Sequence, residues 1–423
     1  MSFSRFLPRR AAGLAVAVCA LAWLPSPVLS ADPADPTYAT PTYGALLARL
    51  DAMPLAMEAA ALSDAAQAQA AQAHALPNPS LGWEAENVLG DGPYSGFGGG
   101  ETTFSVTQPL ELFGQRGARI AAARAEADAT ELRSEQMRWR AASRLALAYA
   151  GAEAAARRLQ LAEEVLALTE QDADAVARLV QEGREASLRG VQAASEAQAA
   201  LASVDAARAM RDGAFARLAA FALLDRVSAL GDSLLDREPR SMAHPSDAPL
   251  AVRLAEAEVN AANARVTVEQ RRARPELSVS AGARRFRGAD DDAFTIGVNL
   301  SVPLFDRNRG GIRAAYAQER AAQARLAAQQ QEAHAERIGA EATLTASASR
   351  TRAADAGLAA AEEAYRLARV GVDAGRVSQL ELRASRTTLI AARNAVVDAR
   401  LARVLAEIDL ARLDGRAPFE DAR

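Results

Sequence analysis

Few residues in this 423-residue chain could form a catalytic or metal centre. Its three histidines, His74, His244 and His334, are far apart in the sequence, and Cys19 is its one cysteine. A zinc-type site needs three or four His, Cys or carboxylate ligands at characteristic spacings. We find no nucleophile paired with a base and no phosphate-binding loop. The sequence therefore predicts neither an enzyme nor a bound metal, and we expect no cofactor.

Composition and charge argue against a nucleic-acid partner and favour long helices. The net charge is −4, and the basic residues, all arginines, do not form a tract. Binding to nucleic acid requires a concentrated basic surface. Half of the residues are hydrophobic but only 5% are aromatic. Alanine supplies most of the apolar count, which is typical of extended helices that pack closely.

Two distant stretches repeat one pattern, a strand followed by a helix. The first, from Glu101, is ETTFSVTQPLELFGQRGARIAAARAE, and the second, from Ala293, is AFTIGVNLSVPLFDRNRGGIRAAYAQE. Alternating apolar and polar residues predict a strand in each, and we expect Pro109 to end the first strand because it has no N–H. Pairs of glycines should turn the chain into each helix: Gly114 with Gly117, and Gly310 with Gly311. A pattern that occurs twice indicates an internal duplication.

A helix and another strand precede each of these stretches. Pro54 and Pro249 each open a Pro-Leu-Ala segment that we expect to be helical for about seven turns. Pro79 and Pro275 each precede a further alternating segment. Each half therefore contains a hairpin of two strands. The sequence predicts four strands in all, each with one apolar and one polar face.

Long helices that fold back on themselves fill the rest of each half. Apolar residues recur at the spacing of a coiled-coil seam. These seam residues are Leu159, Ala162, Leu166, Thr169, Ala173, Val176 and Val180 in the first half and Leu358, Ala361, Tyr365, Ala368 and Val372 in the second. We expect a helix from Ala118 to Glu182, a break at Gly183 and a return through 187–224. The second half repeats this arrangement, with a break at Gly375 and a return through 378–413.

These patterns divide the chain into segments. They are a signal peptide at 1–30, an N-terminal arm with a short helix at 31–53, a first repeat at 54–225, a linker at 226–248, a second repeat at 249–414 and a C-terminal tail at 415–423. An arginine-containing start, an apolar run and small residues before Ala31 indicate the signal peptide. Acylation of Cys19 is the alternative, disfavoured because Val18 stands where a small residue is needed.

The predicted fold is mainly α with a β-barrel contribution: an internally duplicated chain with long coiled-coil helices and four transmembrane strands. Glu84, Glu86 and Arg284 lie on the polar strand faces, which require water, whereas the apolar faces require lipid. Four strands cannot close a barrel alone, and open edges in lipid leave backbone groups unsatisfied. We therefore expect a trimeric α/β barrel whose lumen is lined by Glu84, Glu86 and Arg284.

Over nearly all of its mature sequence the chain resembles outer-membrane efflux ducts of the TolC type. The stretches QAQAAQAHALPNPSL, ETTFSVTQPLELFGQRGARI and LSVPLFDRNRGGI are most similar to the subgroup that serves heavy-metal exporters of the cobalt–zinc–cadmium kind. The resemblance implies a homotrimeric channel in the outer membrane with most of its helical body in the periplasm. It implies two partners, a periplasmic adaptor (membrane fusion) protein and a proton-driven RND-type pump of the inner membrane. The expected function is a passive exit duct for heavy-metal cations.

The resemblance also gives roles to the two helix breaks. The second turn of the family has a glycine, then a Ser or Thr, then an acid, which Gly375, Ser378 and Glu381 match. It implies that Glu381 forms a ring of carboxylates at the pore constriction; the alternative is a solvated helix charge. The implied adaptor-docking tips are Gly183, Arg184, Gly375, Arg376 and Ser378. In the first turn, Ala186 and Arg189 stand where a Ser and an acid would match the pattern of the second turn. Ala384 stands where some relatives have a further acid.

Two other functions are consistent with the same residues. The duct could carry drugs, organic solvents or secreted polypeptide, since the pump selects the cargo. A soluble periplasmic coiled-coil adaptor belongs to another class, and the paired alternating strands count against it. Asp290–Asp292 either attracts cations at the outer mouth or is a solvated loop. Trp83 and Phe97 either anchor at the membrane interface or pack against lipid.

Overall fold

The computed structural model describes residues 40–88, 91–92, 99–238, 248–289 and 291–420. The expected signal peptide with Cys19, residues 31–39 of the N-terminal arm, Phe97, His244 and Asp290 lie outside these residues. The chain divides into two units, Met1–Thr37 and Tyr38–Arg423, and every described residue belongs to the second.

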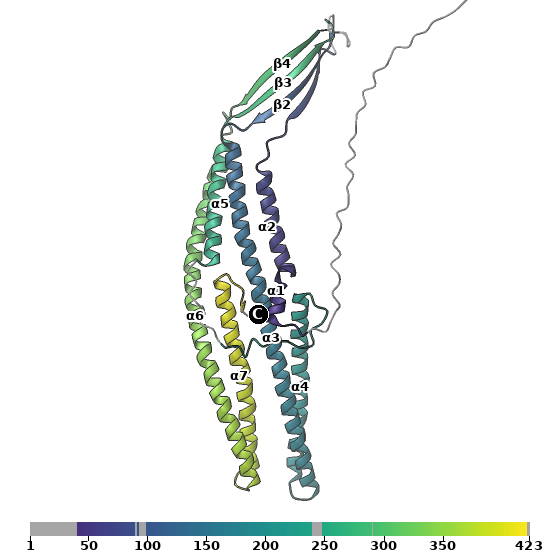
Figure 1. The fold of residues 1–423 in the computed structure, drawn as a ribbon, viewed down its shortest axis with the longest axis vertical. Coiled ribbons are helices and arrows are strands. Elements are labelled where there is room, and N and C mark those ends of the chain that lie inside the picture. Colours follow the sequence, from purple (N-terminus) through teal and green to yellow (C-terminus); the bar gives the residue numbers. More distant parts are fainter. Residues whose placement is uncertain (1–39, 89–90, 93–98, 239–247, 290, 421–423) are drawn as a thin grey trace, which may run out of the picture. The chain divides into compact units, whose positions relative to one another are not determined.

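Apart from two short helices at the start of the first half, the two halves of the chain have the same order of elements (Figure 1). The first half contains α1 (Tyr43–Ala48), the short 3-10 helix η1 (Leu50–Ala52), α2 (Pro54–Gln72), β1 (Ser80–Glu86), β2 (Glu101–Leu110), α3 (Gln115–Gln181) and α4 (Ser187–Ala222). The second half contains α5 (Leu250–Arg272), β3 (Glu276–Phe286), β4 (Asp291–Ser301), α6 (Arg309–Asp373) and α7 (Gln379–Leu413). Each half therefore consists of a helix, a strand hairpin, a long helix and a return helix, which confirms the predicted duplication.

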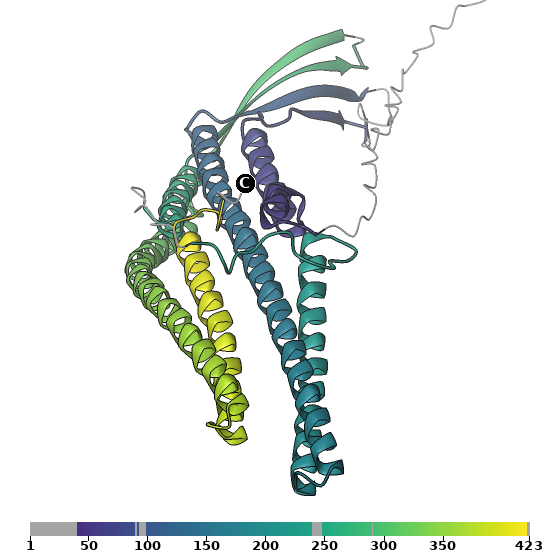
Figure 2. The same ribbon diagram turned by 60° about the horizontal axis from the view of Figure 1, so that its bottom comes forward.

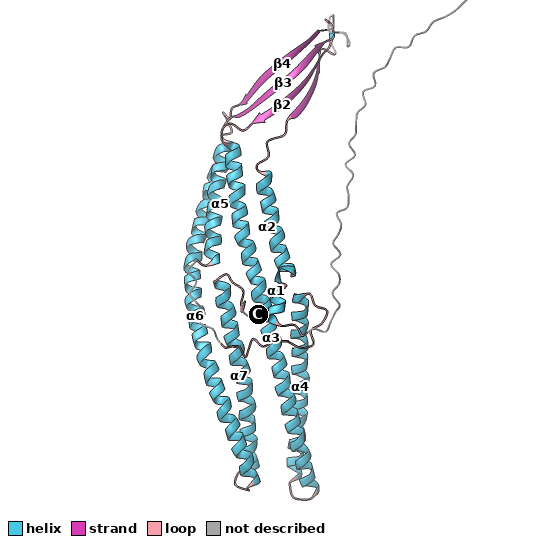
Figure 3. Cartoon of the chain, viewed as in Figure 1, coloured by secondary structure: helices cyan, strands magenta, loops and turns pink. Residues whose placement is uncertain are grey.

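The two hairpins form one antiparallel sheet in the order β1-β2-β3-β4 (Figure 3). The halves meet across its centre, where β2 pairs with β3. Strands β1 and β4 are the edges. All four predicted strands are present. In the described part of the chain, no helix combines the length and the apolar character that crossing a membrane requires.

The first strand-to-helix junction differs in detail from the prediction. Pro109 does not end β2, which continues to Leu110. Pairing with β1 has already stopped at Thr107, so Pro109 has a neighbouring strand on one side only, where a residue without an N–H is tolerated. Gly114 has the expected left-handed backbone, with φ of 85°, but α3 begins directly after it, and Gly117 lies inside the helix.

The second junction turns at Asn308 rather than at a glycine. Asn308 has φ of 48°, a conformation that asparagine adopts more readily than most residues. Its side-chain amide donates to the backbone carbonyl of Glu269 at 3.0 Å and to its carboxylate at 2.6 Å, which ties the junction to α5. Gly310 and Gly311 lie within α6, where a Cβ on Gly311 would collide with the side chain of Asn308.

Helices α2 and α5 are shorter than the predicted seven turns. They contain 19 and 23 residues, which correspond to about five and six turns. The segment that follows α2 contains Pro77 and Pro79, and prolines disfavour helix at the preceding residue. Pro54 is the first residue of α2, as predicted, whereas Pro249 precedes α5 as its N-cap.

The two predicted coiled-coil seams are confirmed. Helix α3 packs against α4, and α6 packs against α7. Every predicted seam residue on α3 and α6 is buried or half-buried. The apolar spacing therefore identified the correct helix face in both halves.

The hydrophobic core surrounds the middle of α3. The alanine-rich part of α3, 141–155, packs with α1 and with the C-terminal parts of α4 and α7. Small side chains allow these backbones to approach closely. Val227, Leu234 and Leu235, from the predicted linker, are also buried in this core. The described part of the linker is thus a structural element of the helical body.

Candidate functional site

One face of the sheet exposes large apolar side chains in rows that cross the strands. Strand pairing forms one row from Trp83, Phe104, Ala283 and Phe294, and the next from Leu81, Val106, Ala281 and Ile296. The side chains of Phe294 and Ile296 are 91% and 88% exposed. A continuous apolar surface of this kind is unfavourable in water and is suited to contact with hydrocarbon or a partner.

The opposite face of the sheet is polar and crowded with small residues. One of its rows consists of Gly82, Ser105, Gly282 and Thr295. A Cβ on Gly82 would lie 2.7 Å from Ser105 Oγ, and a Cβ on Gly297 would lie 2.6 Å from Ser280 Oγ. Crowding of this kind indicates the concave side of a curved sheet, and the curvature is visible in Figure 2.

Arg284 is the centre of a charged cluster on the polar face. Its guanidinium lies 2.9 Å from the carboxylate of Glu86 and 3.0 Å from that of Glu101, and it donates to Thr103 Oγ1 at 2.9 Å. Glu84 lies on the same face and is exposed. The structure therefore brings Glu86 and Arg284 together as an ion pair. It adds Glu101, which only the strand register could identify, because Glu101 lies opposite Glu86.

The two helix breaks form the same turn at equivalent positions. Gly183 and Gly375 both have a left-handed backbone, with φ of 70° and 69°. In each turn the N–H of the following arginine, Arg184 or Arg376, donates at 2.8 Å to a carbonyl five residues earlier. This is the hydrogen-bond pattern by which glycine ends a helix. Both predicted breaks are confirmed.

The second turn carries a capping box that the first turn lacks. Ser378 Oγ accepts from the N–H of Glu381 at 3.2 Å, and Glu381 Oε2 accepts from the N–H of Ser378 at 2.8 Å and from its hydroxyl at 3.0 Å. These bonds, the backbone one first, lower the pKa of Glu381, whose side chain is exposed. The equivalent cap in the first turn is Ala186, which has no side-chain hydrogen bond. Glu381 therefore has a local structural role that the Ser-x-x-Glu motif could have revealed.

Both hairpin ends expose large apolar side chains. Leu188 and Val191 near the start of α4 are 66% and 69% exposed, and Leu380 at the start of α7 is 73% exposed. Leu367 and Val370, near the end of α6, are exposed as well. Apolar residues gathered at the end of a long helical hairpin indicate a surface that contacts a partner.

Arginines of α7 connect the second hairpin to the first. Arg393 lies 2.7 Å from Glu164 of α3, and Arg386, which is buried, pairs with Asp172 of α3. Both arginines point from the return helix of the second repeat to the long helix of the first. These pairs hold the two repeats side by side below the core.

The core contains a buried polar cluster that the sequence analysis missed. Glu153 of α3 is 5% exposed. Its carboxylate accepts from the N–H groups of Leu234 and Leu235 at 2.8 and 3.2 Å, and from Ser233 Oγ at 2.6 Å. Arg157, one turn further along α3, lies 2.7 Å away and balances the charge. A charged side chain thus binds the linker backbone to α3.

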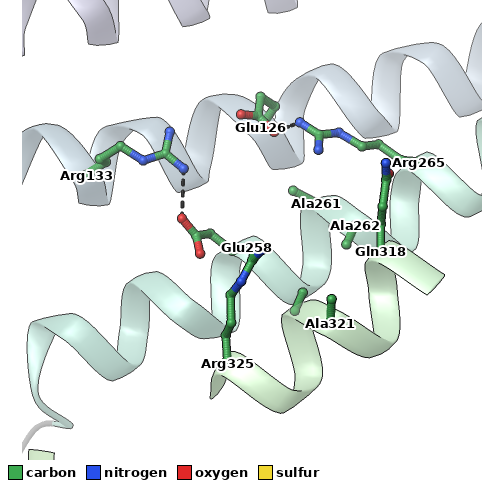
Figure 4. Close-up of a pocket in the computed structure, with 10 residues that line it drawn as sticks. Glu126, Arg133, Glu258, Ala261, Ala262, Arg265, Gln318, Ala321 and Arg325 are labelled. Atoms are coloured by element: carbon green, nitrogen blue, oxygen red, sulfur yellow. Dashed lines mark hydrogen bonds and ion pairs between the residues drawn. The ribbon is translucent and has the colours of Figure 1, made fainter. Parts of the chain in front are cut away.

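Other charged residues of the helical body are arranged in pairs rather than as metal ligands. In a cavity of about 360 Å³ between α3, α5 and α6 (Figure 4), Arg133 donates to Glu258 at 2.9 Å and Arg265 to Glu126 at 2.6 Å. Within the described ranges, no three His, Cys, Asp or Glu side chains are grouped so as to hold a metal ion. The described histidines, His74 and His334, are both exposed.

Comparison with known proteins gave consistent matches in sequence and in fold. The family described as outer membrane efflux protein matches residues 50–222 and 249–416. The nickel-cobalt-cadmium resistance protein NccC of Alcaligenes xylosoxydans xylosoxydans is 44% identical over 388 residues, which cover 90% of this chain and 88% of NccC. The nickel and cobalt resistance protein CnrC of Cupriavidus metallidurans is 42% identical over 280 residues, 65% of this chain and 66% of CnrC. The open state of the MtrE outer membrane channel of Neisseria gonorrhoeae has a similar fold, with a TM-score of 0.76 at 20% identity over 90% of this chain and 91% of MtrE.

Proposed function

Because the chain belongs to the outer membrane efflux protein family, we propose that three copies form an outer-membrane channel for heavy-metal cations. The sheet carries this proposal, since it exposes an apolar face and has edges at β1 and β4. Open edges in lipid leave backbone groups without hydrogen bonds. Pairing β4 of one copy with β1 of the next removes these edges. A closed trimer then presents apolar faces to lipid and polar faces to a water-filled lumen.

The names of the relatives support metal cations as the cargo. NccC is named for resistance to nickel, cobalt and cadmium, and CnrC for resistance to nickel and cobalt. In the proposed lumen Arg284 is already paired with Glu86 and Glu101, while Glu84 is exposed. Such a surface attracts a hydrated cation without replacing its water shell. The duct is therefore passive, and the energy for export comes from its partners.

The hairpin ends supply the surface for those partners. We place the periplasmic adaptor on Gly183, Arg184, Gly375, Arg376 and Ser378, the residues of the two turns. The exposed leucines beside both turns support this placement, since they would be covered on docking. The adaptor connects the duct to an inner-membrane, proton-driven pump of the RND type.

Glu381 is our candidate for the pore constriction. Three copies of its carboxylate would form a ring of negative potential where cations enter. The capping box supports this role because it lowers the pKa of Glu381 and holds the carboxylate beside the turn. The carboxylate would therefore keep a defined position in the assembled channel.

Deletion and complementation in the native host test the cargo. A deletion strain should lose tolerance to Ni²⁺, Co²⁺ or Cd²⁺ and regain it when the gene is restored. If tolerance to hydrophobic drugs or solvents is lost while metal tolerance is kept, the cargo assignment is wrong and the duct serves a different pump. Membrane fractionation and cross-linking provide the separate test of the channel itself, because a soluble monomer would exclude it.

A further inference from the structure

A basic cavity lies where the apolar face of the sheet meets the helices. Leu110 of β2 and Leu277 of β3 pair in the last row of that face before the helices begin. Both line a cavity of about 470 Å³, whose other wall includes Arg271 and Arg272 of α5. One cavity therefore joins a wall suited to hydrocarbon to a wall with two adjacent guanidinium groups.

Three arginines and two glutamates line this cavity, so its net charge is positive. Arg119 is paired with Glu111 and also donates to two backbone carbonyls near the end of α2, which commits its donors. Arg272 is paired with Glu269 at 3.0 Å, but its side chain is 69% exposed and has further donors. Arg271 makes one long hydrogen bond, 3.5 Å, to the carbonyl of Phe113. Arg271 and Arg272 of α5 therefore have donors left to bind an anion.

The surface around the cavity also exposes large apolar residues at both strand-to-helix junctions. Leu112 of the first junction is 65% exposed, and Leu304 and Phe305 of the second are 62% and 101% exposed. Arg271 contacts the first junction through Phe113, and Glu269 contacts the second through Asn308, so both junctions adjoin the end of α5. Apolar side chains beside arginines are typical of protein segments at a membrane–water interface.

We propose that this cavity binds the phosphate of an anionic glycerophospholipid in the periplasmic leaflet, with Arg271 and Arg272 as its donors. The proposal rests on the proposed function, because it takes the apolar face of the sheet as the lipid-facing surface. Guanidinium groups form bidentate, charge-assisted hydrogen bonds with phosphate. The acyl chains would run along the apolar rows that begin at Leu110 and Leu277. The cavity lies between the two central strands, away from the edges that neighbouring copies would cover.

Native mass spectrometry of the detergent-solubilised full-length protein tests the site. Phosphatidylglycerol should bind with an affinity at least about tenfold higher than phosphatidylethanolamine, and the Arg271→Gln/Arg272→Gln variant should lose that preference. The single Arg272→Gln variant, at an exposed side chain, should lose about threefold and guards against misfolding of the double variant. Arg325→Gln, an exposed arginine that lines the cavity of Figure 4, is the matched control and should bind like wild type.

Three results would overturn the assignment. These are equal binding of the two lipids by wild type, an unchanged preference in the double variant, and displacement of the lipid by millimolar inorganic phosphate, which would indicate a simple anion site. Membrane fractionation and metal tolerance are measured on the same variants. If the protein is a membrane-inserted trimer that confers tolerance yet shows one of these results, the lipid site alone is wrong. Absence of insertion would instead refute the channel.

Discussion

Truncating Glu153 should release the linker from the helical body. The substitution Glu153→Ala removes the acceptor for the N–H groups of Leu234 and Leu235 and for Ser233 Oγ. Loss of one partner from a buried, hydrogen-bonded ion pair costs about 3–5 kcal/mol. Here Arg157 keeps a second partner in Asp236 and is partly exposed, so we take the lower limit, about 3 kcal/mol.

Where amide exchange follows the opening equilibrium, a local loss of about 3 kcal/mol corresponds to roughly hundredfold faster exchange. Hydrogen–deuterium exchange of peptides that cover 226–238 in the solubilised protein measures this directly. Glu163→Ala is the control on the same helix, because Glu163 is exposed and its ion pair with Arg208 is long at 3.8 Å and therefore weak. This variant should change exchange by less than about threefold. If linker protection in Glu153→Ala also stays within threefold of wild type, the cluster does not hold the linker.

Four further predictions concern the turn and the sheet. Glu381→Gln keeps the capping box, since Gln also serves at that position, so folding should be unchanged while cation selectivity in planar bilayers falls. Glu185→Gln near the first turn should reduce selectivity less. Equal selectivity of the two variants would identify Glu381 as a solvated charge. Because hydrogen bonding lowers the pKa of Glu381, its contribution to the cap is fully present above the usual glutamate range and is lost as the pH falls through the lowered pKa, so exchange protection of the first turn of α7 should persist until the pH falls below that range. Ser378→Ala should speed exchange in the first turn of α7 about fivefold, for a cap worth about 1 kcal/mol, and no change there would mean that the turn is held from outside. Ile296→Arg, in the apolar row, should cost about 2–4 kcal/mol of insertion and reduce the outer-membrane fraction on immunoblots, whereas Asn299→Arg, at an exposed position of the polar face, should be tolerated; the reverse order would mean that the faces are assigned the wrong way round.

The elements that the sequence predicted well are those with local, periodic signals. Alternation at Phe294, Thr295 and Ile296 identified both the strand and its faces, because successive side chains of a strand point to opposite sides. The coiled-coil seams and the left-handed glycines at the breaks followed from equally local rules. Repetition of the whole pattern added the duplication. The errors at Pro109 and Gly117 are small shifts of element boundaries, where local signals are least precise.

Other features of the candidate site depend on groups that are distant in the chain. Glu101 joins Glu86 and Arg284 only because the register places β1, β2 and β3 side by side. Asn308 turns the second junction because α5 offers Glu269 as a partner for its amide. The capping box of Glu381 is the exception, since its Ser-x-x-Glu spacing is local and was available in the sequence.

The sequence by itself determined the duplicated order of helices and hairpins, the polarity of each strand face and the positions of both turns. Each of these depends on backbone geometry over a few residues, which fixes where neighbouring side chains point. Only the tertiary structure decided that Glu153 binds the linker, that Arg284 gathers two glutamates, and that the arginines of α5 adjoin the last apolar row of the sheet. Those contacts join residues far apart in the chain, and their energies depend on distance and burial, which no periodic pattern contains.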